Sequence, residues 1–551
     1  MSGQRRLRAR VDTTVAAIAG ITVVGFALRL AVLFRPIGVI DKLFIPDDTY
    51  YTLTIARSLA HGHGPTVDGH TLTSGFQALL GFLLVPVFWV TDNPDTALRL
   101  DLALLVVVDT LTIVVVAWVA YRFAGRVAAV AAAALWAISP IAVSMALGGL
   151  ETSLAILFEI GLVAVWMWAN DLDADERATG DRATDDRHGT RRWIVVGVVA
   201  GLAVLARIDT LLLVALLGGV QLWRGPRRPL VPGAIAGAVV LAPWWIWCTV
   251  TFGTPIPTSG SAAHDVAPLR PFAGEGLAQV AGAVVGGPFD VWRSLREWLN
   301  DHPVAGIVVF WALVLGLLLV AVWWARRRVL PQLAVATLPV FAAGLLVFYA
   351  WFGVGWYFTR YLAPVALVAA LMIAVGVARV WRARGKWRLP AFAATAIVLA
   401  IGGGAALRAD TRHLTATEAA ELSFDSVTGY RDAARLAVSV PPPGSVLGAW
   451  QSGAFGYYAN DRITVVNLDG VVNPAAADAA RADRTAFYIR DRGIGWLADF
   501  DLHLVWFAFR GSQQLDPKPT LTTTKLPQFP PFPGYGVGRI NWPPGSGVRS
   551  R

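Results

Sequence analysis

The chain has 551 residues, of which 56% are hydrophobic and only 15% are charged. Soluble globular domains carry roughly 25% charged residues, so this composition excludes an ordinary soluble protein and indicates an integral membrane protein. The net charge of +10 does not indicate a nucleic-acid partner, because the arginines occupy short clusters between apolar segments, as the positive-inside rule predicts. The single cysteine, Cys248, excludes a disulfide within the chain.

The N-terminal residues, 1–10, are basic and precede an apolar run that is long enough to span a bilayer. A cleaved signal peptide shares part of this pattern, but no cleavage site of small residues follows the run. We therefore interpret it as an uncleaved first span with a cytoplasmic N-terminus. With about 20 apolar residues per span, we predict 11 transmembrane helices, two of them short, at residues 14–35, 99–121, 127–147, 152–169, 193–206, 209–223, 230–250, 304–325, 330–351, 361–381 and 388–407.

A further apolar run, residues 76–91, decides the topology. If it crossed the membrane, every later Arg-rich connection would lie outside; if it is re-entrant or interfacial, all of them become cytoplasmic. We therefore predict that it does not cross, and that the short runs 193–206 and 209–223 are separate spans. This topology places a long first loop, residues 36–98, on the extracytoplasmic side of the plasma (inner) membrane, together with everything after residue 408.

The C-terminal part is polar and mixed, and residues 408–526 are predicted to form an extracytoplasmic α/β domain. The periodicity indicates helices at 428–438 and 475–490 and short buried strands at 445–449, 463–467 and 502–507. The Pro- and Gly-rich tail, 527–551, is predicted to lack regular structure. The predicted fold is thus an all-α polytopic membrane domain of about 11 transmembrane helices, residues 1–407, followed by this α/β domain.

The most informative polar feature is the acidic pair Asp47-Asp48, which opens a predicted juxtamembrane helix in the first loop. Carboxylates at a helix start can cap free N–H groups and face the positive end of the helix dipole, so we expect one of the pair to cap this helix. Two carboxylates exceed what capping requires, and placing charge beside a membrane is costly. We therefore expect the other one to be functional; the sequence does not separate the two roles.

Further polar groups fall on the same predicted side of the membrane. Glu151 is the only acid between the third and fourth spans, where it is either an ordinary helix-start carboxylate or a functional one. Arg207 and Asp209 could pair with each other or line a recessed, wet cavity between short spans. Arg360 could extend its charge toward the interface or bind a phosphate. His63, in the first loop, is either merely exposed or a substrate ligand.

This collection of charges above an apolar floor suits an amphiphilic substrate such as a polyprenyl phosphate sugar. The lipid tail would stay in the membrane, an arginine would bind the phosphate, and a carboxylate would deprotonate an acceptor hydroxyl. Inversion at the anomeric carbon of the sugar requires only that one base when phosphate is the leaving group. A divalent cation such as Mg or Mn, held by Asp47, Asp48 and Glu151, could also assist departure of the phosphate.

Several short motifs together resemble the GT-C superfamily of polytopic membrane glycosyltransferases. The resemblance is to the branch of the protein mannosyltransferases and aminoarabinose transferases, and to actinobacterial arabinofuranosyltransferases of cell-wall assembly. It rests on four segments: Asp47–Phe76 with its Gly-His-Gly-Pro stretch, Gly149–Thr152, Tyr357–Pro364 and Asn467–Asn473. Many relatives carry Asp-Glu where this chain has Asp-Asp, and not all have the C-terminal domain.

The resemblance implies a lipid-linked donor and an inverting transfer on the extracytoplasmic side, with a first-loop aspartate as base. Asp47 or Asp48 would be that base, and Glu151 a second acid near the acceptor or an ion. Arg207 or Arg360 would bind the donor phosphate. The other candidate substrate ligands are Arg57, His63, Asp209 and Tyr357. The acceptor would be an envelope glycan, lipid or protein. The alternatives are a transporter or flippase of lipid-linked sugars and a non-catalytic envelope assembly protein.

Overall fold

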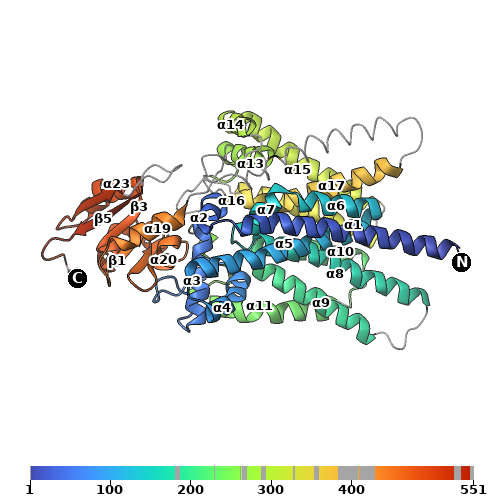
Figure 1. Ribbon diagram of the computed structural model, residues 1–551, viewed down its shortest axis with the longest axis horizontal. Helices are drawn as coiled ribbons and strands as arrows, with labels where there is room; N and C mark the ends of the chain where they lie inside the picture. Colours follow the sequence, from blue (N-terminus) through green and yellow to red (C-terminus); the bar gives the residue numbers. More distant parts are fainter. Residues whose placement is uncertain are drawn as a thin grey trace.

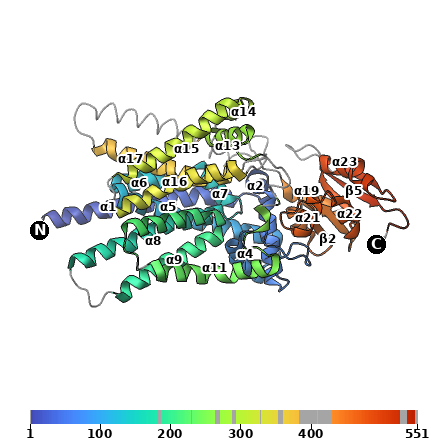
Figure 2. The same cartoon turned by 180° about the vertical axis from the view of Figure 1, so that it is seen from behind.

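The computed structural model describes residues 2–179, 186–228, 230–260, 262, 270–286, 293–326, 329–352, 359–382, 408, 429–525 and 535–546. Figure 1 shows an elongated molecule in which a helical bundle carries the N-terminus at one end and a small sheet domain lies at the other. The view from behind, Figure 2, shows the same arrangement.

The bundle consists of apolar helices, most of which are long enough to cross a hydrocarbon layer of about 30 Å. Within the described residues eight helices reach this length, and a ninth is added if the bent pair α6–α7 is one span. The chain is therefore a multi-pass membrane protein. The helices of the bundle are α1 (Ser2–Leu33), α5 (Pro94–Ala124), α6 (Arg126–Ala137), α7 (Pro140–Leu147), α8 (Thr152–Thr179), α9 (Asp186–Ala206), α10 (Leu211–Arg224), α11 (Leu230–Phe252), α15 (Pro303–Ala325), α16 (Leu330–Phe352) and α17 (Ala363–Arg382).

The predicted class, a polytopic all-α domain followed by a small α/β domain, is confirmed. Ten of the predicted spans coincide with helices; the eleventh, 388–407, lies outside the described residues. The run 127–147 is a pair of helices bent by 52°, and 209–223 is a one-turn helix η1 (Ile208–Thr210) followed by the short α10. Arg382 donates to the carbonyl of Ala124, so the basic ends of α5 and α17 meet at one end of the bundle.

The first loop folds into three short helices at the end of the bundle that faces the sheet domain (Figure 1). They are α2 (Ile37–Phe44), α3 (Asp47–Ala60) and α4 (Ala78–Val90). With 13 residues, α4 is too short for a full crossing, which needs about 20. Its length agrees with the prediction that residues 76–91 do not cross the membrane. A later loop between spans contributes α13 (Gly274–Gly286) and the amphipathic α14 (Arg293–Asp301).

The C-terminal domain is built on a five-stranded sheet in the order β2-β1-β3-β5-β4. The strands β2, β1 and β3 are parallel, whereas β5 runs antiparallel to both β3 and β4. The elements are α19 (Tyr430–Ser439), β1 (Val446–Ala449), α20 (Gly453–Ala459), β2 (Thr464–Asn467), α21 (Pro474–Arg481), α22 (Thr485–Asp491), β3 (Trp496–Phe500), α23 (Asp501–Phe509), η5 (Gly511–Gln514), β4 (Thr520–Lys525) and β5 (Tyr535–Asn541).

The structure confirms two of the predicted strands, as β1 and β2, and the predicted helix 428–438, as α19. It corrects the other predicted elements of the domain. The run 502–507 is helical, within α23, and the strand precedes it as β3. A short apolar run does not distinguish a strand from a buried helix, and the buried Asp499 interrupts the apolar pattern of β3. The predicted helix 475–490 is two helices, α21 and α22.

The prediction that residues 527–551 lack regular structure is wrong for β5. Val537 and Ile540 on this strand are buried, and the strand pairs with β3 and β4. The glycines that suggested a coil serve packing here: a Cβ on Gly538 would lie 2.8 Å from Cδ1 of Leu521. The sheet therefore extends beyond residue 526, where the predicted domain ended.

One hydrophobic core joins the first loop to the C-terminal domain. It contains Leu43 of α2 and Leu53 of α3 together with Ala437 of α19, Tyr457 of α20 and Val537 of β5, all buried. Polar contacts surround it: Arg431 of α19 binds both carboxylate oxygens of Asp95, at 2.6 and 3.0 Å. The C-terminal domain is thus docked on the first loop, and this positions the site described next.

Candidate functional site

The two carboxylates of the acidic pair, Asp47 and Asp48, bind different parts of the protein. The carboxylate of Asp47 accepts hydrogen bonds from the backbone N–H groups of Gly453 (2.9 Å) and Ala454 (2.8 Å), which begin α20. The expectation that one of the pair caps its own helix is wrong, because Pro46 occupies the N-cap position of α3 and no side chain caps that helix. Asp47 instead satisfies the free N–H groups of another helix, more than 400 residues further along the chain.

The surroundings of Asp47 change its proton affinity. Burial raises its pKa to about 7, although the two backbone N–H groups act in the opposite direction. Burial also raises the pKa of Asp469 to about 7, and the nearby Asp47 contributes to that rise. The hydroxyl of Tyr51 on α3 accepts a hydrogen bond from Nδ2 of Asn467 on β2 at 3.0 Å, so α3 contacts the sheet domain here. The interface between α3 and the sheet domain therefore contains two carboxyl groups that titrate near neutrality.

Asp48 points to the membrane domain instead. One carboxylate oxygen lies 2.6 Å from a guanidinium nitrogen of Arg360, whose side chain is 14% exposed, whereas the Asp48 side chain is 42% exposed. Arg360 lies in a one-turn helix, η3 (Thr359–Leu362), at the start of α17. This pair joins two residues 312 positions apart and leaves Asp48 as the accessible member of the acidic pair.

A second ion-pair cluster forms around Arg207, which follows the last residue of α9. Its guanidinium binds Glu151 at 2.7 Å and Asp209 at 2.7 Å. The same side chain also donates to the hydroxyl of Tyr349 on α16 at 2.8 Å. Both interpretations of Arg207 and Asp209 therefore apply, since the two residues pair with each other and also line a cavity.

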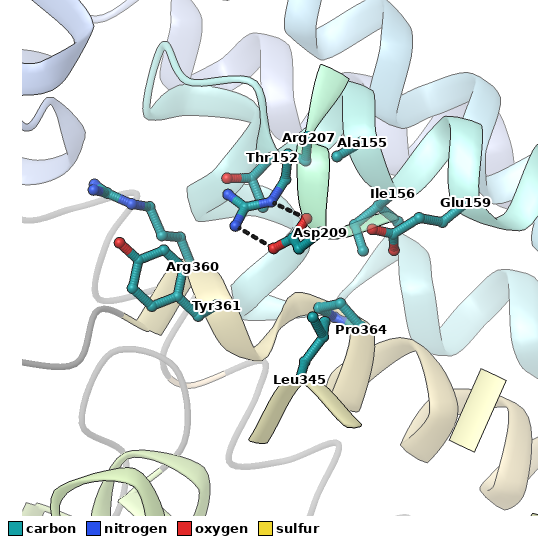
Figure 3. Close-up of a pocket in the computed structure, with 10 residues that line it drawn as sticks. All are labelled: Thr152, Ala155, Ile156, Glu159, Arg207, Asp209, Leu345, Arg360, Tyr361 and Pro364. Carbon is teal, nitrogen blue, oxygen red and sulfur yellow. Dashed lines mark hydrogen bonds and ion pairs between the residues drawn. The ribbon is translucent and has the colours of Figure 1, made fainter. Parts of the chain in front are cut away.

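This cavity lies between α8, η1, α16 and the start of α17 (Figure 3). Its free space is about 10 Å³, roughly what one water molecule needs. In Figure 3, Arg207 and Asp209 lie between Arg360 on one side and Glu159 on the other. The lining residues are Thr152, Ala155, Ile156, Glu159, Arg207, Asp209, Leu345, Arg360, Tyr361 and Pro364.

The four segments that carry the sequence resemblance meet around this region. A Cβ on Gly149, which has φ +68°, would lie 2.3 Å from Cγ2 of Thr49, so the segment 149–152 packs against the start of α3. A Cβ on Gly75 would lie 2.0 Å from the carbonyl oxygen of Val471, so the segments 47–76 and 467–473 are in contact. The segment 357–364 joins them through the ion pair of Arg360 with Asp48.

Other sequence candidates lie elsewhere or are not described. Arg57 donates to the backbone carbonyls of Tyr457 (3.1 Å) and Gly456 (3.4 Å), so it holds α20 rather than facing the cavity. His63 is exposed, beside His61, and Tyr357 lies outside the described residues.

A cation site made by Asp47, Asp48 and Glu151 does not fit the geometry. Each of these carboxylates is engaged by a different group, namely α20, Arg360 and Arg207. Within the described part of the chain, no group of three or more His, Cys, Asp or Glu side chains could hold a metal ion.

Sequence reasoning missed two polar residues of the cavity region, Glu159 and Tyr349. Glu159 carried a signal, since it is the only charged residue of the span 152–169, and an ionisable group inside a membrane span indicates function by default. Tyr349 carried none, because a tyrosine near the end of a span is common at the membrane interface.

Comparison with known proteins identifies the fold. No family model and no curated protein sequence matches the chain. Among solved structures, the archaeal oligosaccharyltransferase AglB from Archaeoglobus fulgidus, in complex with an inhibitory peptide and a dolichol-phosphate, superposes with a TM-score of 0.57 at 14% identity. The match covers 88% of this chain and 69% of AglB.

ArnT from Cupriavidus metallidurans matches over nearly the whole of both chains. In the apo state it superposes with a TM-score of 0.55 at 14% identity, covering 98% of this chain and 100% of ArnT. Bound to undecaprenyl phosphate, it gives 0.54 at 15% identity, with coverages of 96% and 99%. The chain has a GT-C fold. The resemblance to arabinofuranosyltransferases and to mannosyltransferases stays a prediction.

Proposed function

We propose that this GT-C protein transfers a sugar from a polyprenyl-phosphate donor to a hydroxyl of an envelope glycan, lipid or protein on the extracytoplasmic side. The observation that supports it best is the pair of Asp48 with Arg360 at the mouth of a polar cavity. In this proposal Asp48 is the base and Arg360 binds the phosphate, and the two lie side by side where the bundle meets the first loop. ArnT has been solved with undecaprenyl phosphate and AglB with dolichol-phosphate, and we extend that ligand class to this chain.

In this proposal Arg360, rather than Arg207, binds the donor phosphate. A guanidinium has five N–H donors, so Arg360 can hold a phosphate oxygen while it keeps its contact with Asp48. Arg207 already binds the carboxylates of Glu151 and Asp209, which neutralise its charge and weaken its attraction for an anion.

The reaction then follows from the position of Asp48. Its carboxylate takes the proton of the acceptor hydroxyl, and the oxygen attacks the anomeric carbon on the face opposite the phosphate. The bond from that carbon to the phosphate oxygen breaks, and the polyprenyl phosphate leaves with its added negative charge facing Arg360. The anomeric configuration inverts, and Asp48 returns the proton to solvent, to which its side chain is 42% exposed.

We assign Asp47 a different role, which is to hold the C-terminal domain on the first loop through α20. The test compares Asp48→Asn with Asp47→Asn in purified protein supplied with a panel of polyprenyl-phosphate-linked sugars and acceptors. We expect Asp48→Asn to abolish transfer while thermal unfolding is unchanged, and Asp47→Asn to lower the unfolding temperature. Full transfer by Asp48→Asn, with transfer lost in a stably folded Asp47→Asn protein, would reverse the two roles. A wild-type protein that transfers no sugar from the panel but moves lipid-linked sugars across vesicles would favour the flippase alternative.

A further inference from the structure

Glu159 is a buried acid that no part of the proposed reaction uses. It lies on α8 seven residues after Thr152, roughly 10 Å deeper along the helix. Only 1% of its surface is exposed, and within the described part of the chain its Oε2 has no hydrogen-bond partner. A buried polar atom without a partner costs about 1–3 kcal/mol, so an ordinary structural role does not explain it.

The position of Glu159 relates it to the cavity. Its side chain lines the cavity together with Arg207 and Asp209, on the side away from Arg360 (Figure 3). The free space of about 10 Å³ is the size of one water molecule, and hence of one hydroxyl group. It is too small for a whole sugar ring, so only one hydroxyl would enter it while the ring stays outside the cavity.

The charges around Glu159, at the end of the cavity away from Arg360, disfavour binding of an anion. Arg207 already contacts two carboxylates, those of Glu151 and Asp209. Glu159 adds a third acidic group around one guanidinium. A negatively charged group that entered here would lie beside a guanidinium that Glu151 and Asp209 already neutralise, in a poorly solvated site where an uncompensated charge is costly. A hydroxyl would instead supply the hydrogen that Oε2 lacks.

We propose that Glu159 determines donor specificity by accepting a hydrogen bond from one hydroxyl of the donor sugar, which is therefore a sugar without a negative charge. The proposal rests on the proposed function, with the phosphate at Arg360 and the sugar reaching inward from it. A site built to bond a substrate hydroxyl strongly rejects an analogue that lacks it, because the buried acceptor is then left without a partner.

Two variants separate the acceptor role from the charge. Glu159→Leu removes the acceptor at similar size, and Glu159→Gln keeps an acceptor oxygen without the charge. Glu275→Gln, at an exposed acid of α13, is the control. Binding to purified protein is measured for undecaprenyl phosphate without sugar, for undecaprenyl phosphate carrying neutral hexoses or pentoses, for their single-deoxy analogues, and for undecaprenyl phosphate carrying glucuronic acid.

We expect Glu159→Leu to weaken binding of the preferred neutral sugar lipid about 10-fold and to leave binding of undecaprenyl phosphate unchanged. One deoxy analogue should bind wild type about 10-fold more weakly and should bind Glu159→Leu with no further loss. Glu159→Gln should retain most of the affinity for the neutral sugar, because it keeps an acceptor oxygen. Thermal unfolding should be unchanged or raised in both variants, which a structural role for the carboxylate would not give.

The outcomes that contradict the proposal are distinct from those that contradict the function. A wild type that binds undecaprenyl phosphate with equal affinity with and without every sugar would overturn the role of Glu159 alone. The role of Glu159 would also be overturned if every deoxy analogue lowered the affinity of Glu159→Leu and of wild type equally, or if wild type bound the glucuronic acid lipid more tightly than the neutral sugar lipids. A wild type that binds no polyprenyl phosphate at all would overturn the proposed function.

Discussion

The carboxylate of Asp47 lies 2.9 Å from the backbone nitrogen of Gly453, and this contact joins the first loop to the C-terminal domain. The approach is close: a Cβ on Gly453 would lie 2.3 Å from the backbone oxygen of Asp47. An alanine at 453 would therefore push α20 away from α3 and lengthen both hydrogen bonds of the carboxylate.

We predict that Gly453→Ala destabilises the docking of the C-terminal domain by about 1–3 kcal/mol, the usual cost of overpacking. Limited proteolysis of the membrane-reconstituted protein should cut the domain faster. Gly456→Ala is a matched control, since it lies in the same helix and its Cβ would meet only ordinary contacts at 3.9 Å or more. Equal proteolysis of the two variants would contradict this account.

The pKa of Asp47 makes stability depend on pH. Burial raises its pKa in the folded protein to about 7, against roughly 3.9 in an unfolded chain. Between these values the folded state holds a proton that the unfolded state has released, so the free energy of unfolding falls as pH rises from about 4 to about 7. Asp41 and Asp469, both with a pKa raised to about 7 by burial, act in the same direction. Thermal unfolding in detergent should show this fall, with a smaller slope in Asp47→Asn; stability that rises over the interval would be the opposite of the prediction.

Arg360 provides a prediction about ligand affinity. Arg360→Ala removes the proposed phosphate ligand and should weaken binding of undecaprenyl phosphate about 10-fold or more, since hydrogen bonds to charged groups contribute about 1.5–3 kcal/mol. Arg360→Lys keeps the charge but loses the planar fork and should be intermediate. Titration of the purified variants with undecaprenyl phosphate measures both. Unchanged affinity in Arg360→Ala would exclude Arg360 as the phosphate ligand.

An ion pair inside the bundle supports the break between α6 and α7. Arg29 binds Asp109 at 2.5 Å with both side chains buried, and it also donates to the carbonyl of Ala137 at 2.9 Å, where α6 ends. Removing one partner leaves a buried charge, so we predict that Arg29→Leu lowers the unfolding free energy by about 3–5 kcal/mol. The double variant Arg29→Leu with Asp109→Leu should recover part of this loss. A double variant that is less stable than the sum of the single ones would contradict the pairing.

Two helices of the bundle approach each other at glycines. A Cβ on Gly197 of α9 would lie 1.9 Å from the carbonyl oxygen of Gly233 on α11, a close backbone contact that small residues permit in membranes. We predict that Gly197→Ala destabilises the protein by about 1–3 kcal/mol. Gly161→Ala on α8, where a Cβ meets nothing within 4 Å, should instead be neutral or stabilising. Thermal unfolding of the two variants decides.

The sequence by itself determined the multi-pass character, the positions of the described spans and the presence of a small α/β domain. These features depend on residues that are neighbours in the sequence. The length of an apolar segment decides whether it can cross a bilayer, and the local pattern of apolar residues predicts the strands β1 and β2. It also singled out Asp47, Asp48, Glu151, Arg207 and Arg360, because a charge next to an apolar span is conspicuous in a list of residues.

The partners of those charges were decided only by the tertiary structure. Asp47 binds α20 and Asp48 binds Arg360, more than 300 residues away in each case, and no local pattern encodes which distant segment packs against α3. The same limit hid β5, whose Gly-rich sequence becomes a strand only because β3 and β4 offer it hydrogen bonds on both sides. Local composition sets where each segment resides, whereas the pairing energies that build a site depend on packing between segments that are remote in the chain.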